Sequence, residues 1–251
     1  MDLNVLQNLK TNNIHYDPYP HIYIENVYPT KTFDTLYENF PVSAIKDNTQ
    51  AIQSHTHRYL ADDVLNKDVC NTPNIWKDFF ELHTSQKFYD QVLNIFNTNF
   101  KKYIGENVRV RGTEGNTKIV TDTQFVVHRP YESTTRTTHL DNPLELYAGL
   151  LYFRQRDDKT KGGNFEIFKT DEIKQVYANT GREVPENVEK TLAKTIPYKA
   201  NSFVLFVNTN KSVHGVTPRA KTLFDRLSVN IIAEIERRKD APLFKLEEIQ
   251  K

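Results

Sequence analysis

Three side chains in this sequence have the types and spacing of a metal site: His139, Asp141 and His214. In an extended strand, residues i and i+2 point to the same face, so His139 and Asp141 can converge on one point. If the fold brings His214 beside them, two imidazoles and one carboxylate occupy one face of a metal ion. This donor set suits non-haem Fe(II) and leaves the opposite coordination positions open for chemistry.

The surroundings of these residues favour a site over the simpler interpretation, a surface histidine beside a turn at Asn142. A polar, turn-rich segment (132–138) leads to His139, and an apolar run (144–153) follows directly. His214 likewise follows the apolar run 203–207. Candidate ligands at two strand ends form a more specific pattern than either does alone. His55 and His57 share the i, i+2 spacing, but no third ligand supports a second metal site there.

The first 107 residues begin with a polar arm and a strand at 21–27, and helical periods dominate the rest of this part. Apolar residues recur at i, i+3, i+4 and i+7 over 33–40, and Thr72-Pro73 offers a helix start before a Trp76-containing apolar stripe. A second stripe, from Phe88 to Phe100, belongs to a helix that begins near Thr84. We expect these helices to pack against the outside of a sheet.

From residue 108 onward the period changes to that of strands. The expected strands are 108–111, 119–128, 146–153, 165–168, 203–207 and 223–235. Residues 157–163 form a hairpin loop with two glycines, and the polar insertion 170–195 is expected as a lid over a barrel mouth. Helices followed by many short strands predict an α+β fold built on a jelly roll. The expected organisation is one domain over 1–251, with supporting helices in 1–107, a catalytic core in 108–235 and a tail in 236–251.

Composition limits the classes of partner. The chain has 33 basic and 32 acidic residues, a net charge of +1, and no long block of one sign. We therefore expect no nucleic-acid or membrane binding. The single cysteine, Cys70, excludes an intramolecular disulfide and fits a reducing compartment. Without a leader sequence or a long apolar run, the expected protein is soluble and cytoplasmic. Oligomeric state is not readable from the sequence.

Together the motifs resemble the iron(II)/2-oxoglutarate-dependent oxygenase superfamily, in particular its prolyl-4-hydroxylase-like branch. The resemblance rests on His139-x-Asp141, His214, Arg226-x-Ser228, and the segments 162–167 and 201–206, and it covers roughly residues 119–234. It implies a double-stranded β-helix, a form of jelly roll. It also implies Fe(II), O2 and the co-substrate 2-oxoglutarate, with ascorbate as a candidate auxiliary.

The resemblance assigns further residues to the co-substrate. His139, Asp141 and His214 are the implied iron ligands, and Arg226 with Ser228 is the implied anchor of the far carboxylate. Arg219 is the rival anchor. Many prolyl-hydroxylase-like members have Lys where this chain has Arg226. Either His128 or Tyr131 is expected to contact 2-oxoglutarate as well.

The leading functional hypothesis is a dioxygenase that hydroxylates an unactivated C–H bond while 2-oxoglutarate is decarboxylated to succinate. The substrate is left open among amino acids, peptides and small metabolites, because a fold transfers chemistry better than substrate. Two alternatives are a non-catalytic jelly roll that binds sugar or metal, and a cupin-type hydrolase or isomerase that uses the metal as a Lewis acid. Neither alternative needs a buried arginine beyond the second histidine.

Overall fold

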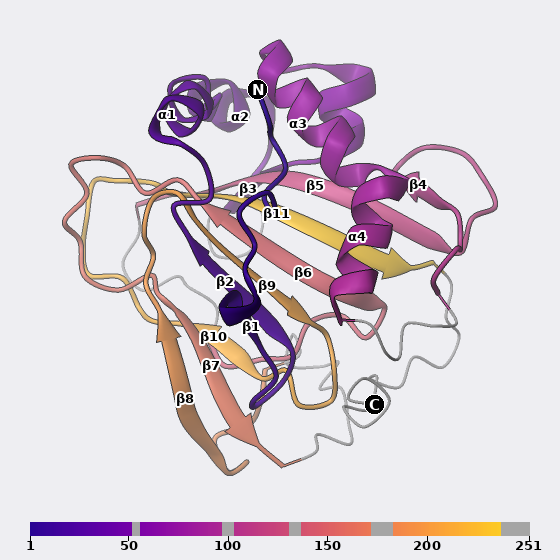
Figure 1. The fold of residues 1–251 in the computed structure, drawn as a ribbon. Helices are drawn as coiled ribbons and strands as arrows, with labels where there is room; N and C mark the ends of the chain where they lie inside the picture. Colours follow the sequence, from indigo (N-terminus) through magenta and orange to yellow (C-terminus); the bar gives the residue numbers. More distant parts are fainter. Residues whose placement is uncertain (52–55, 97–102, 131–136, 172–182, 237–251) are drawn as a thin grey trace.

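The computed structural model describes residues 1–51, 56–96, 103–130, 137–171 and 183–236 of the 251-residue chain (Figure 1). Two β-sheets and a group of N-terminal helices make up this part of the molecule. The predicted α+β class and jelly-roll architecture are confirmed. The prediction that residues 1–251 form a single domain stays a prediction.

The larger sheet has eight strands in the order β1-β2-β9-β6-β11-β5-β3, with β4 paired to β5. All pairs are antiparallel except β4 with β5. Its strands are β1 (Ile14–His15), β2 (His21–Glu25), β3 (Thr56–Tyr59), β4 (Val108–Val110), β5 (Ile119–His128), β6 (Glu145–Tyr152), β9 (Ser202–Val207) and β11 (Arg226–Ile235). The long central strands β5, β6 and β11 are almost wholly buried because both of their faces are covered.

The smaller sheet has the strand order β10-β7-β8. Its strands are β7 (Phe165–Thr170), β8 (Lys190–Ile196) and β10 (His214–Val216). It lies against one face of the larger sheet, and a small apolar core that includes Phe165, Ile196 and Phe206 fills part of the space between them. We call this face of the larger sheet its inner face.

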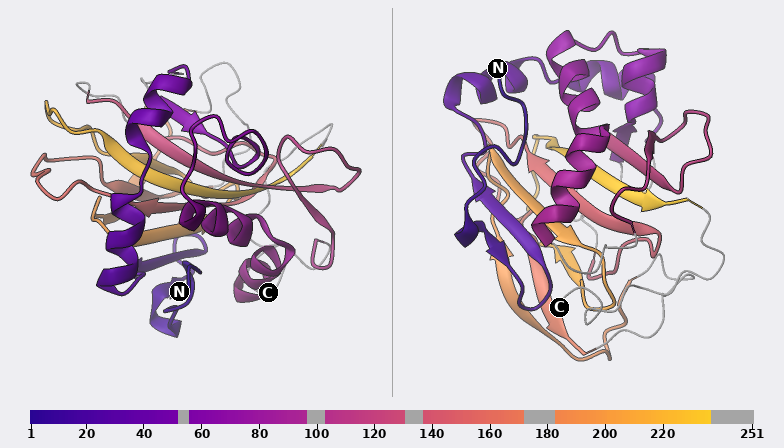
Figure 2. Two further views of the ribbon diagram at one scale, coloured as in Figure 1. Left: turned by 90° about the horizontal axis from the view of Figure 1, so that it is seen from above. Right: turned by 45° about the vertical axis from the view of Figure 1, so that its right-hand side comes forward.

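Helices cover the opposite, outer face, as two views show (Figures 1 and 2). They are η1 (Thr11–Asn13), α1 (Thr30–Glu38), α2 (Val42–Asn48), η3 (Asp63–Lys67), α3 (Asn74–Thr84) and α4 (Gln86–Phe96). The indole of Trp76 on α3 lies 4.8 Å from the ring of Phe125 on β5, and Phe40 lies 4.9 Å from the same ring. This aromatic cluster fixes the helices on the sheet, as the apolar stripes predicted.

The alternation of strand residues separates an apolar outer face from a partly polar inner face. Phe125 and Val127 of β5 point into the main core with the helices. Gln124 and His128 therefore point inward. The same alternation in β11 turns Arg226 inward, because Arg226 is paired directly with His128. The strand alternation thus brings polar chemistry to the space between the sheets.

Several predicted elements differ from those observed. The segment 170–195 is not one long lid: β7 extends to Thr170, and Lys190–Ile196 is β8, an edge strand of the smaller sheet. Its polar residues reflect the exposed position of an edge strand. Residues 172–182, which carried most of the lid prediction, lie outside the described part. The last strand begins at Arg226 and not at 223, and residues 42–71 contain α2, β3 and η3, which no clear period had indicated.

None of the helices in the described part of the chain combines the length and the hydropathy that a bilayer crossing requires. The predicted cytoplasmic location stays a prediction.

Candidate metal and co-substrate site

The structure brings His139, Asp141 and His214 together; we call these three residues the ligand triad. An isolated β-bridge joins the two histidines, with reciprocal backbone N–H···O distances of 2.8 and 3.1 Å. Asp141 Oδ1 lies 3.6 Å from His139 Nε2, and Asp141 Oδ2 lies 3.6 Å from His214 Nε2. One ligand atom from each residue lies within 4.8 Å of the other two. Two residues of one short segment and a third residue far along the sequence therefore present N, N and O donors to one point.

Backbone carbonyls orient both imidazoles of the ligand triad. His139 Nδ1 donates to the carbonyl of Thr137 at 2.7 Å, and His214 Nδ1 donates to that of Ser212 at 2.8 Å. This assigns the proton to Nδ1 and leaves the lone pair of each Nε2 directed toward Asp141. Both histidines are buried. Two imidazoles held in this orientation, with one carboxylate, fit a divalent metal such as Fe(II).

Arg226 is the first residue of β11 and is 2% exposed. Its Nε donates to the carbonyl of Gly163 at 3.2 Å. Its guanidinium carbon lies 5.1 Å from the ring centre of Tyr152 and 4.9 Å from that of Tyr198. Within the described part of the chain, the buried Nη2 has no hydrogen-bond partner. A buried cationic donor without an acceptor is costly, so this group is suited to bind an anion.

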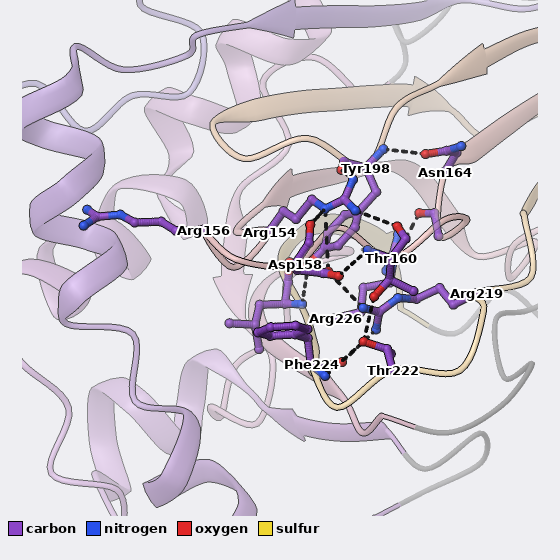
Figure 3. Close-up of polar contacts among 12 residues, drawn as sticks. Arg154, Arg156, Asp158, Thr160, Asn164, Tyr198, Arg219, Thr222, Phe224 and Arg226 are labelled. Carbon is purple, nitrogen blue, oxygen red and sulfur yellow. Dashed lines mark hydrogen bonds and ion pairs between the residues drawn. The ribbon is translucent and has the colours of Figure 1, made fainter.

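Arg219, the rival anchor, is engaged elsewhere (Figure 3). Its Nη2 donates to Asp158 Oδ2 at 2.9 Å, with both side chains almost fully buried, and its Nη1 donates to the carbonyl of Phe224 at 3.0 Å. Arg154 adds a second cation 3.6 Å from the Asp158 carboxylate. Asp158 therefore compensates the charge of Arg219 and holds the side chain in place.

The Gly-Gly pair in the loop after β6 joins this region to the loop before β11. Gly162 and Gly163 have φ values of +87° and +79°, which other residues adopt only with strain. Gly163 donates its N–H to the carbonyl of Thr217, and a Cβ on Gly162 would lie only 1.8 Å from the carbonyl oxygen of Pro218. This close approach sets the position of the Gly163 carbonyl that receives Arg226.

Two tyrosines were missed by the sequence reasoning. Tyr152 and Tyr198 are buried with their rings in edge contact at 5.3 Å, and both rings pack on Arg226. Burial raises the pKa of Tyr198 to about 12, against the opposing effect of Arg226. The Tyr152 hydroxyl has no hydrogen-bond partner in the described residues. Strand alternation could have placed Tyr152 on one face, but not beside an arginine from another strand.

Of the other residues predicted to contact the co-substrate, the structure describes His128 and Ser228. His128 lies opposite Arg226, and its Nδ1 lies 2.9 Å from the hydroxyl of Thr56. Burial, with the nearby arginine charges, holds the pKa of His128 well below its usual value. Ser228 is buried on the same face as Arg226, and its hydroxyl donates to the side-chain oxygen of Asn230 at 3.4 Å. Tyr131 lies outside the described residues.

The described residues form no metal site around His57. His57 is buried on β3, and its Nδ1 is within hydrogen-bond distance of Thr49, at 3.0 Å from the hydroxyl. His55 lies outside the described part. Within the described residues, the ligand triad is the one group of three or more candidate ligands that converges.

Comparison with protein families supports a site for Fe(II) and 2-oxoglutarate. Residues 122–233 match the model of the 2OG-Fe(II) oxygenase superfamily. These residues include every member of the ligand triad, Arg226 and Ser228. No curated protein matches the chain significantly.

Solved structures share the fold at low sequence identity. A prolyl 4-hydroxylase of Phytophthora capsici matches with 15% identity and a TM-score of 0.50, covering 86% of this chain and 59% of its own. This chain thus spans somewhat more than half of that protein. The carbocyclase SnoK from nogalamycin biosynthesis matches with 12% identity and a TM-score of 0.54, covering 92% and 86%. The epimerase SnoN from the same biosynthesis matches with 11% identity and a TM-score of 0.51, covering 86% and 78%. At these identities the likeness shows the fold, which supports different reactions.

Proposed function

Because residues 122–233 match the model of the 2OG-Fe(II) oxygenase superfamily, we propose that the chain is an oxygenase of this kind and that it hydroxylates an unactivated C–H bond of an amino acid, a peptide or a small metabolite. The overall reaction would convert substrate, O2 and 2-oxoglutarate into hydroxylated substrate, succinate and CO2. When bound, Fe(II) and 2-oxoglutarate supply the oxidising chemistry of the superfamily. The family match supports the predicted enzyme class, a 2-oxoglutarate-dependent oxygenase.

One observation carries the residue assignments: a convergent ligand triad lies in the same fold as a buried arginine whose Nη2 has no partner in the described chain. We assign His139, Asp141 and His214 as metal ligands through the two Nε2 atoms and a carboxylate oxygen. The donor set and the fixed imidazole orientation support this assignment.

We assign the far carboxylate of 2-oxoglutarate to Arg226. Its Nη2 can donate to that carboxylate, and the Tyr152 hydroxyl, which has no partner in the described residues, can add a second donor. The ion pair of Arg219 with Asp158, which compensates its charge, supports Arg226 over Arg219 for this role. The packed rings of Tyr152 and Tyr198 keep water away from the guanidinium, which strengthens its interaction with an anion.

The test is succinate formation from 2-oxoglutarate with Fe(II), O2 and ascorbate, first without substrate and then with a substrate panel. The proposal expects slow succinate release that is lost in Asp141→Ala and stimulated by the true substrate. A wild-type protein that binds neither Mn(II) nor 2-oxoglutarate would refute it. That result would favour the non-catalytic jelly-roll alternative.

A further inference from the structure

Within the ligand triad, Asp141 is the member that no β-bridge fixes. The bridge between His139 and His214 sets the two histidines relative to each other. Asp141 follows two residues after that bridge, belongs to no strand, and leads into a turn before β6 begins at Glu145. Because this segment lies outside the sheet ladders, the position of its carboxylate depends on contacts from other parts of the fold.

Asn208, the residue directly after β9, contacts the turn that follows Asp141. Its side chain is fully buried. Its Nδ2 donates to the carbonyl of Asn142 at 2.7 Å and to the carbonyl of Glu145 at 3.1 Å. Since Asn142 is the next residue after Asp141, one amide group fixes the backbone on the carboxyl side of this aspartate.

The same amide also reaches the segment that carries His214. Its Oδ1 lies 3.2 Å from the hydroxyl of Ser212, and the carbonyl of Ser212 accepts the Nδ1–H of His214 at 2.8 Å. The flipped amide would place Oδ1 against two carbonyl oxygens, so the orientation of Asn208 is fixed. Asn208 thus links the backbone beside Asp141 to the residue that orients His214.

The hydrogen bonds around Asn208 form a buried and closed network. Asn208, Thr209 and Ser212 are all fully buried. The Ser212 hydroxyl accepts the N–H of Thr209 at 2.9 Å and lies 2.9 Å from the carbonyl of the same residue. Buried polar groups with satisfied partners are rigid. Such rigidity is what a metal site needs, because its ligands must be held within about 0.5 Å of the binding geometry.

We propose that Asn208 is a positioning residue of the metal centre, which holds the Asp141 carboxylate in place against the two imidazoles. This inference rests on the proposed function, because it takes the ligand triad as the metal ligands. Asn208 acts through the backbone of Asn142 and through Ser212, so its replacement loosens the site without removing a ligand. Loss of a residue that orients a metal ligand costs about 10-fold to 100-fold in metal affinity.

Asn201, at the opposite end of β9, offers a matched control. Its buried amide makes the same kind of link: Nδ2 donates to the carbonyl of Tyr28 at 2.8 Å, and Oδ1 accepts the N–H of Tyr28 at 2.9 Å. The length of β9 places the two asparagines roughly 20 Å apart. Asn201 has a φ of +58°, so alanine there adds backbone strain to the lost hydrogen bonds. Asn201→Ala therefore shows what a loss of stability alone does to the metal site.

The experiment compares Mn(II) binding by wild type, Asn208→Ala, Asn208→Leu and Asn201→Ala. Calorimetry gives the dissociation constant, the electron paramagnetic resonance spectrum of bound Mn(II) reports how uniform its ligand geometry is, and thermal melting gives the stability. Leucine keeps the shape of the asparagine side chain and removes its polar atoms. Asn208→Leu therefore tests the inference even if the cavity left by alanine prevents folding.

We expect both Asn208 variants to raise the dissociation constant for Mn(II) about tenfold and to broaden the resonance lines of the bound ion. Asn201→Ala should lower the melting temperature at least as far while keeping the Mn(II) affinity and the spectrum of wild type. The inference is overturned if the Asn208 variants bind Mn(II) as wild type does, or if Asn201→Ala weakens binding equally. Failure of the proposed function differs, since wild type itself would then bind no Mn(II), which would overturn both.

Discussion

Replacing Arg226 should separate co-substrate binding from metal binding. The guanidinium is 2% exposed, lies between two tyrosine rings and has one partnerless nitrogen in the described chain. A hydrogen bond to a charged group contributes about 1.5–3 kcal/mol. The far carboxylate of 2-oxoglutarate, left without its partner, adds a desolvation cost. Arg226→Ala should therefore raise the dissociation constant for 2-oxoglutarate by about 10-fold to 150-fold.

The assay is calorimetric titration of 2-oxoglutarate into the Mn(II)-loaded protein, with Mn(II) affinity measured separately. Mn(II) binding without co-substrate should hardly change, because Arg226 is not a member of the ligand triad. Arg226→Lys should give an intermediate constant, since lysine keeps the charge but loses the planar pair of donors.

Arg219→Ala provides the contrast. It leaves the buried Asp158 carboxylate without its closest cation, and breaking such a pair costs about 3–5 kcal/mol of unfolding free energy. For a chain of this size that corresponds to a melting temperature lower by roughly 6–20 °C. If Arg219→Ala instead gave a selective loss of 2-oxoglutarate affinity and Arg226→Ala left it unchanged, the assignment of the anchor would be wrong.

Three further predictions concern the metal, acid stability and backbone strain. Alanine at any position of the ligand triad should weaken Mn(II) binding by more than about 100-fold, because losing even a residue that only hydrogen-bonds to a metal ligand costs about 10-fold to 100-fold in affinity. Calorimetry should show unchanged Mn(II) affinity in the control His57→Ala. Equal losses of affinity in the triad variants and in His57→Ala would contradict the site. Burial lowers the pKa of His83 to about 3, so only the unfolded chain takes up this proton between pH 6.5 and 3. The free energy of unfolding should therefore fall as pH falls through this window, by about 1.4 kcal/mol per unit from this residue; urea melts of His83→Gln should show a shallower fall, and an unchanged slope would exclude His83 as the source. Gly162→Ala should strongly destabilise the fold through the Pro218 contact, whereas Gly105→Ala, with φ +80° and open space, should cost only about 1–2 kcal/mol by thermal melting; similar losses would argue against the packed loop.

The sequence by itself predicted the convergent ligand triad and the type of most elements. Strand spacing made His139 and Asp141 neighbours on one face, and the order of periods gave helices followed by strands. The strand at Ile119–His128 was predicted to the residue. These features are local: each depends on side chains a few positions apart, and so can be read from a short window of sequence.

Sequence patterns failed where an element depends on distant partners. The strand Lys190–Ile196 has a largely exposed, polar composition and is a strand only because it pairs with Phe165–Thr170. Its polar side chains look like a loop in isolation, since an edge strand needs no second buried face. The strand at Thr56–Tyr59 was missed for a related reason: it is four residues long and exists through its pairing with β5.

Only the tertiary structure distinguishes the surroundings of the two candidate arginines. Arg219 and Arg226 are seven positions apart and identical in chemistry, so no local pattern could rank them by their surroundings. The choice depends on Asp158, a residue from a different loop that is buried against Arg219 and not against Arg226. Charge compensation in a protein interior acts over a few ångströms whatever the sequence separation, and for that reason the role of each arginine is a property of the folded molecule.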